Sequence, residues 1–152
     1  MAAITAPFPS GPWFHELVAR ATADTAAIER LGIAEFRFGM EILFPDGSSL
    51  LFGLVLDGYD ITAEGPVTES SFEPDVVFSG SLEAWTEMTG WIEDNGPADS
   101  GHSLNGLSIA GTPFEVRSSD AMGGDKFYRY MGTLQAVFDA AGAPAPVPTG
   151  AA

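Results

Sequence analysis

The stretch 75–111 constrains this sequence most, because it has the pattern of a strand, a helix and a second strand. The apolar run 76–78 predicts the first strand. Ser81 can then cap a helix by accepting a free amide of its first turn. The second strand is predicted at 107–110. Apolar residues recur in the helix at spacings of three or four and define one apolar face: Leu82, Trp85, Met88 and Ile92.

The residues before this unit predict a helix followed by three antiparallel strands. Apolar residues at helical spacing over 13–31, followed by Gly32 as a C-cap, predict the helix. Strict alternation over 33–44 predicts a strand whose one face is almost wholly phenylalanine and methionine. Two further strands are predicted at 49–57 and 59–64, and the segment between each pair contains a turn glycine.

The last third of the chain predicts one more helix. Asp125 is a suitable N-cap for a helix over 125–141, which carries a continuous apolar stripe. The segment 111–124 is compatible with an extension of the last strand or with a flap. Residues 1–12 form an N-terminal extension in this prediction, and 142–152 form a disordered tail rich in proline and alanine.

These elements predict a single α+β (mixed α/β) domain over 13–141, with a five-stranded sheet covered by helices. The 21 acidic and six basic residues give a formal charge of −15, which opposes binding to nucleic acid or to an anionic membrane surface. No apolar run approaches the length of a membrane span, and no leader pattern begins the chain. We therefore expect a cytoplasmic protein with no stable membrane insertion.

Few residues are suited to catalysis or metal binding. The chain has no cysteine and only two histidines, His15 and His102. His102 has Asp94 and Asp99 as acidic neighbours, but all three lie in a polar connection typical of a surface. The paired glycines before Asp125 offer amides to an anion, although ordinary capping explains them equally well. We predict no catalytic residue, no metal site and no cofactor.

The central and C-terminal segments together resemble the sterol carrier protein 2 (SCP2-like) family. The segments DVVFSGSLEAWTEMTG and LNGLSIAG, followed by a methionine-containing amphipathic helix, carry this resemblance. Either Met122-Gly123 or Met131-Gly132 matches the Met-Gly pair that the family has near its last helix. The matching positions in the two segments are Asp75, Val77, Phe78, Trp85, Thr89, Gly90, Gly106, Leu107, Ile109 and Gly111.

The resemblance implies an apolar tunnel that binds a sterol, a fatty acid or a fatty acyl ligand such as an acyl-CoA. Tyr128, Arg129 and Tyr130 are candidates to orient its head group. A filled core explains the apolar residues about as well as a cavity does, and only the resemblance favours the cavity. The predicted cavity wall consists of Phe36, Phe38, Met40, Trp85, Met88, Phe127, Met131, Leu134 and Phe138.

Two other function classes stay open at this stage. The first is a small cone-shaped α+β enzyme, such as a SnoaL-like isomerase or hydrolase, which would need a buried carboxylate beside His102. Such enzymes usually finish on strands, whereas this chain is predicted to finish on a helix. The second is a non-catalytic accessory subunit that presents a hydrophobic substrate to an enzyme partner. A homodimer is a further possibility.

Overall fold

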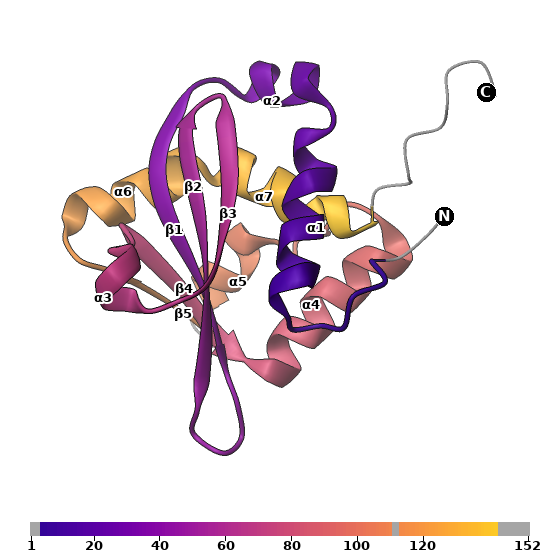
Figure 1. Cartoon of the computed structure of the whole chain (residues 1–152), viewed down its shortest axis with the longest axis vertical. Coiled ribbons are helices and arrows are strands. Elements are labelled where there is room, and N and C mark those ends of the chain that lie inside the picture. Colours follow the sequence, from indigo (N-terminus) through magenta and orange to yellow (C-terminus); the bar gives the residue numbers. More distant parts are fainter. Residues whose placement is uncertain (1–3, 111–112, 143–152) are drawn as a thin grey trace.

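The computed structural model describes residues 4–110 and 113–142 of the 152-residue chain (Figure 1). Its elements follow one another as α1 (Gly11–Thr22), α2 (Thr25–Leu31), β1 (Ala34–Leu43), β2 (Ser49–Gly58), β3 (Asp60–Val67), α3 (Glu69–Phe72), β4 (Val76–Ser81), α4 (Leu82–Asn95), α5 (Leu104–Ala110), β5 (Phe114–Ser118), α6 (Ala121–Arg129), α7 (Met131–Asp139) and the 3-10 helix η1 (Ala140–Gly142). The strands form one sheet in the order β3-β2-β1-β4-β5. The predicted α+β class and the five-stranded sheet are confirmed.

Strand β1 lies at the centre of the sheet, between β2 and β4. It pairs antiparallel with β2 and parallel with β4, so the sheet is mixed. Every second side chain of β1 points into the core, including Phe38 and Met40, which are fully buried. The intervening residues, Arg37 and Glu41 among them, reach the opposite face. Period-two alternation therefore identified both faces of β1 correctly.

Helix α3 covers the outer face of the sheet, and it lies on the opposite side from α1 and α4 (Figure 1). Its Phe72 is buried directly over Gly53 of β2, where any Cβ would overlap the ring. The guanidinium of Arg37 lies 4.2 Å from the centre of the same ring and donates to the Phe72 carbonyl. The cation–π contact and the hydrogen bonds hold α3 on the sheet.

One predicted strand is wrong. The segment 107–110 belongs to α5, and the fifth strand is β5, which pairs antiparallel with β4. Leu104 is fully buried and Leu107 is half-buried, whereas Ile109 is 74% exposed. A spacing of three separates the two inward residues, as in a helix, and the alternation of Leu107 with Ile109 was misleading. The segment 111–124 does not extend a strand at 107–110, because within its described residues 114–118 form the separate strand β5 and 121–124 begin α6.

Two predicted helices are each divided in the structure. The helix expected over 13–31 is α1 followed by α2, because the side chain of Asp24 accepts from the amide of Ala27 and starts a new helix. The helix expected over 125–141 is α6 followed by α7, with the break at Tyr130. The N-cap of α6 is Asp120, and Asp125 lies inside the helix.

The predicted terminal segments are described only in part. Of the N-terminal extension 1–12, residues 4–12 are described; Ile4 is buried in the core and α1 already begins at Gly11. Of the predicted tail 142–152, Gly142 ends η1, and 143–152 lie outside the described residues.

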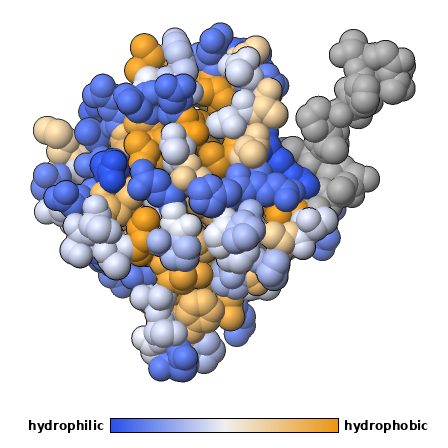
Figure 2. Space-filling view, viewed as in Figure 1, coloured by the Kyte–Doolittle hydropathy of each residue, from blue (hydrophilic) through white to orange (hydrophobic). Residues whose placement is uncertain are grey.

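Figure 2 shows hydrophilic residues over much of one face, with apolar side chains reaching the surface in areas between them. Within residues 4–110 and 113–142, no helix has both the length and the apolar character needed to cross a membrane.

Candidate functional site

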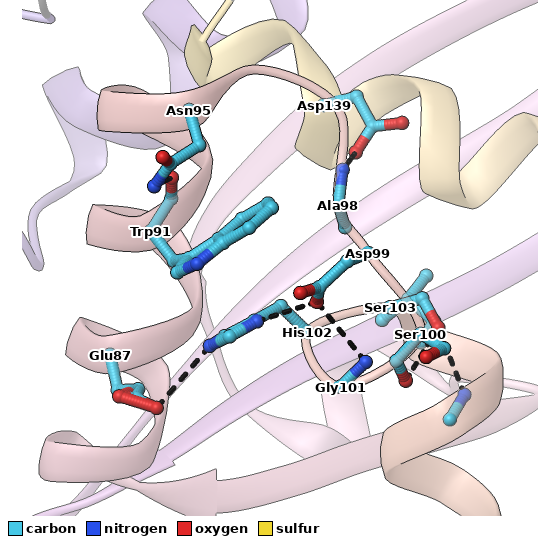
Figure 3. Close-up of polar contacts among 12 residues, drawn as sticks. Glu87, Trp91, Asn95, Ala98, Asp99, Ser100, Gly101, His102, Ser103 and Asp139 are labelled. Atoms are coloured by element: carbon cyan, nitrogen blue, oxygen red, sulfur yellow. Dashed lines mark hydrogen bonds and ion pairs between the residues drawn. The ribbon is translucent and has the colours of Figure 1, made fainter.

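A polar cluster surrounds His102 in the connection between α4 and α5 (Figure 3). The Nδ1 atom of His102 lies 2.7 Å from Oδ1 of Asp99, and its Nε2 atom lies 3.3 Å from Oε1 of Glu87. The imidazole also stacks on the indole of Trp91, with the ring centres 4.6 Å apart. The hydrogen bond from His102 is the main reason that the pKa of Asp99 is lowered. These contacts join the connection to α4.

The same connection is joined to α7 by backbone amides. The amide of Ala98 donates to Oδ1 of Asp139 at 3.1 Å, and the amide of Leu104 donates to Oε1 of Gln135 at 2.8 Å. Gln135 in turn donates to Asp139 at 2.8 Å. Two side chains of α7 therefore hold this connection in place, and Ser103 caps α5 by accepting from the amide of Gly106 at 3.0 Å.

The His102 cluster lacks the burial that the enzyme alternative requires. Asp99 and Glu87 have side chains that are 52% and 66% exposed, so water solvates both carboxylates. His15, the other histidine, is exposed on α1. No group of three or more potential metal-ligating side chains occurs in the described part of the chain. The cluster is best explained as a set of structural contacts that hold the connection after α4 against that helix.

A second polar cluster lies on the outer face of the sheet. Arg117 of β5 bridges the carboxylates of Glu41 and Glu69, at 2.9 Å and 2.6 Å. The hydroxyl of Ser79 donates to the same Glu41 carboxylate at 2.8 Å. The pKa of Glu41 is lowered, chiefly by its hydrogen bond from Arg117 and also by that from Ser79. This cluster connects β1, β4, β5 and α3, so its evident role is structural.

Replacing Glu41 with glutamine should lower the free energy of unfolding by about 1–2 kcal/mol near neutral pH. Its carboxylate side chain is only 14% exposed and accepts from two partners. The matched control is Glu69→Gln, which removes the 54% exposed partner of the same arginine and should cost less than about 0.5 kcal/mol.

The effect of Glu41→Gln should also depend on pH. Because folding lowers the pKa of Glu41 from 4.5, its carboxylate stabilises the fold above that value, and this contribution is lost as the pH falls through the lowered folded value. Urea unfolding of both proteins should therefore give a difference near pH ~7 that shrinks near pH ~3. An equal difference at both pH values would contradict this account.

The candidate ligand site is a half-open pocket between α4, α5 and β5, with a volume of about 400 Å³. We call it the α4–α5 pocket. Met88 and Phe114 form its inner wall; both side chains are almost fully buried and belong to the core. Glu83 and Glu87 lie at its rim, one turn apart on α4. It is lined by Ser81, Glu83, Ala84, Glu87, Met88, Gly101, Leu107, Pro113 and Phe114.

Directly behind this wall, aromatic side chains fill the space between the sheet and the helices. The indole of Trp85 lies with its ring centre 4.8 Å from that of Phe114 and 5.6 Å from that of Phe138. Phe127 stacks on Phe38 at 6.2 Å. The Trp85 indole N–H also donates to the carbonyl of Glu41 at 2.8 Å, which fastens α4 to β1. The aromatic cluster is thus continuous from α4 to α6.

The structure brings the predicted cavity-wall residues together in one core. Met131 is half-buried against this core, and the other eight are buried: Phe36, Phe38, Met40, Trp85, Met88, Phe127, Leu134 and Phe138. Of the nine, Met88 lines the α4–α5 pocket. The tunnel itself stays a prediction.

The three predicted head-group residues lie where α6 meets α7, and none of them lines the α4–α5 pocket. Tyr128 is 52% exposed, and Arg129 pairs with Asp125 one turn earlier in α6. The pocket residues that sequence reasoning missed are chiefly Leu107 and Phe114. Their apolar character was visible, but the first was placed in a strand and the second in a segment with two alternative structures.

Several solved structures resemble this fold, although no model of a known protein family and no curated protein matches the sequence. A crystal structure of sterol carrier protein 2 is 14% identical and aligns over 91% of this chain and 100% of its own, with a TM-score of 0.62. A solution structure of a conserved hypothetical protein from Thermus thermophilus, described as a candidate sterol carrier protein, is 12% identical. It aligns over 95% of this chain and 96% of its own, with a TM-score of 0.55. The chain therefore has the sterol carrier protein 2 fold, as the resemblance in its sequence predicted.

Proposed function

We propose that this protein is a carrier that binds one hydrophobic small molecule, such as a sterol or a fatty acyl chain. The observation that carries the proposal is the α4–α5 pocket, whose inner wall is apolar and continuous with the aromatic core. Its volume of about 400 Å³ lies within the range of small-molecule sites. The likeness to sterol carrier protein 2 supports the same function from the fold.

Hydrocarbon burial supplies the binding energy in this proposal. Each methylene group removed from water contributes about 0.8 kcal/mol. Met88 suits such a site because its unbranched thioether side chain adapts to ligands of different shape. Leu107 contributes a second apolar side chain from α5. A longer ligand would have to displace the Phe114 ring, which packs on Trp85, before it could reach the residues of the predicted cavity wall.

Replacing Ala84 with leucine tests the location of the site. Ala84 is half-buried and lines the α4–α5 pocket, so a larger side chain should fill it and weaken ligand binding at least about tenfold. The matched control is Ala136→Leu on α7. Ala136 is also half-buried and lines a different pocket, between α1, α2 and α7. Thermal unfolding of both variants would establish that they remain folded.

The measurement is titration of the delipidated protein with a fluorescent sterol and a fluorescent fatty acid. Native mass spectrometry of the purified protein adds a search for a bound lipid. Saturable binding that Ala84→Leu weakens and Ala136→Leu leaves unchanged would support the proposal. Saturable binding weakened only by Ala136→Leu would reject the α4–α5 pocket. Absence of saturable binding for all probes would reject the carrier function.

The accessory role and the homodimer remain predictions from the sequence, as does a cytoplasmic location. Size-exclusion chromatography with light scattering would measure the oligomeric state directly. The enzyme alternative has less support than the carrier, because the carboxylates beside His102 are exposed and the fold is that of sterol carrier protein 2.

A further inference from the structure

The rim of the α4–α5 pocket carries acidic side chains and no basic ones. Glu83 and Glu87 lie one helical turn apart on α4, so their side chains are neighbours on the same face. None of the nine lining residues is a lysine or an arginine. Glu87 has His102 as a partner, whereas Glu83 has no ion-pair partner among the described residues. The rim therefore carries the unpaired carboxylate of Glu83 and the carboxylate of Glu87, which contacts His102, and both lie above an apolar wall.

This arrangement opposes an anionic head group. Two unit charges of like sign about 4 Å apart repel by roughly 1 kcal/mol in water and by several-fold more in a partly dehydrated site. The formal charge of −15 adds repulsion from the whole molecule. Arg117 and Arg129, two of the six basic residues, are occupied by carboxylates elsewhere. A fatty carboxylate or an acyl-CoA phosphate would meet no lysine or arginine among the lining residues, and the imidazole of His102 already contacts Glu87 and Asp99.

We infer that the α4–α5 pocket prefers an amphiphile with a cationic head group, whose hydrocarbon chain lies against Met88, Leu107 and Phe114 and whose head group lies beside Glu83. The inference rests on the proposed carrier function and names its ligand class by charge complementarity. This cationic ligand class differs from the fatty acid and acyl-CoA that the sequence resemblance implied. A long-chain amine is the simplest compound with this chemistry.

The test compares three ligands with the same twelve-carbon chain: dodecylamine, dodecanol and dodecanoate. Each ligand is titrated, below the concentration at which it forms micelles and at low ionic strength, into delipidated protein that holds Nile red, an uncharged fluorescent dye. Loss of dye fluorescence measures its displacement. Dodecylamine should compete at about tenfold lower concentration than dodecanoate, with dodecanol between them. High salt should reduce this difference, because the rim is accessible to ions.

Two variants distinguish the effect of the rim carboxylates on ligand preference from the effect of the protein's net charge. Glu83→Gln should lower the preference for the amine over the carboxylate by about threefold to tenfold. Glu64→Gln removes the same charge from an exposed position on β3, the far edge strand of the sheet, and should leave the preference unchanged.

Each outcome has a distinct meaning. Dodecanoate binding as tightly as dodecylamine would overturn the inference while the carrier function stands. Equal effects of Glu83→Gln and Glu64→Gln would also overturn it, because net charge would then explain the preference. Failure of all three ligands to displace the dye would count against the carrier function itself.

Discussion

Replacing Trp85 with alanine is expected to lower the free energy of unfolding by about 3–5 kcal/mol, the largest single effect we predict for this protein. Its side chain is fully buried and contacts three phenylalanine rings, among them Phe78 and Phe114. The substitution leaves a cavity and also removes the donor for the Glu41 carbonyl. Urea unfolding followed by circular dichroism would measure the loss.

Two further variants test the origin of this effect. Trp91→Ala changes a tryptophan of the same helix that is only half-buried and stacks on His102, so it should cost less than about 2 kcal/mol. Trp85→Phe keeps most of the apolar contact and loses the hydrogen bond, so its cost should be about 1–3 kcal/mol. If Trp85→Ala and Trp91→Ala were equally destabilising, Trp85 would not be the centre of the core.

Gly123→Ala is expected to destabilise the protein by about 1–3 kcal/mol although alanine is the better helix former. Gly123 is buried in the first turn of α6, and a Cβ there would overlap the backbone carbonyl of Asp75. Asp75 cannot retreat freely, because its amide donates to the Arg37 carbonyl and its carboxylate accepts from the Arg37 amide. The first turn of α6 would therefore have to move.

The neighbouring glycine provides the matched control. A Cβ on Gly124 would lie 3.4 Å from the hydroxyl of Ser118, a side chain that can rotate away. Gly124→Ala should then stabilise the protein by about 0.5–1 kcal/mol through its helix propensity. Thermal or urea unfolding of both variants should give shifts of opposite sign. Two shifts of the same sign would show that close approach to Asp75 does not determine the choice of glycine.

Periodicity predicted the buried faces of β1 and α4 correctly, although it joined α1 to α2 and α6 to α7. The alternation in β1 identified which side chains face the core, and the spacing of Trp85 and Met88 identified the buried face of α4. Ser81 caps α4 as expected, with its hydroxyl accepting the amide of Ala84 at 3.1 Å. These features are local, because the repeat of the backbone itself decides which side chains share a face.

The wrong predictions concern short segments whose structure depends on distant partners. The segment 107–110 is too short for its two apolar residues to distinguish a strand from a helix. Ser103 caps α5 locally, whereas Gln135 and Asp139 of α7 accept from the amides of Leu104 and Ala98, and these distant contacts cannot be read from the sequence around 107–110. The N-cap of α6 was misplaced for a different, local reason, since both Asp120 and Asp125 are suitable caps by residue type.

Local sequence patterns were sufficient to establish the class of fold, the apolar faces of the main elements and the acidic character of the chain. Tertiary packing was needed to place Phe114 next to Met88 and Leu107, where they form the α4–α5 pocket beneath Glu83. Packing also placed Arg129 away from that pocket and beside Asp125. The physical reason is that a pocket forms between elements, so its shape and charge depend on how the elements pack, which no local pattern encodes.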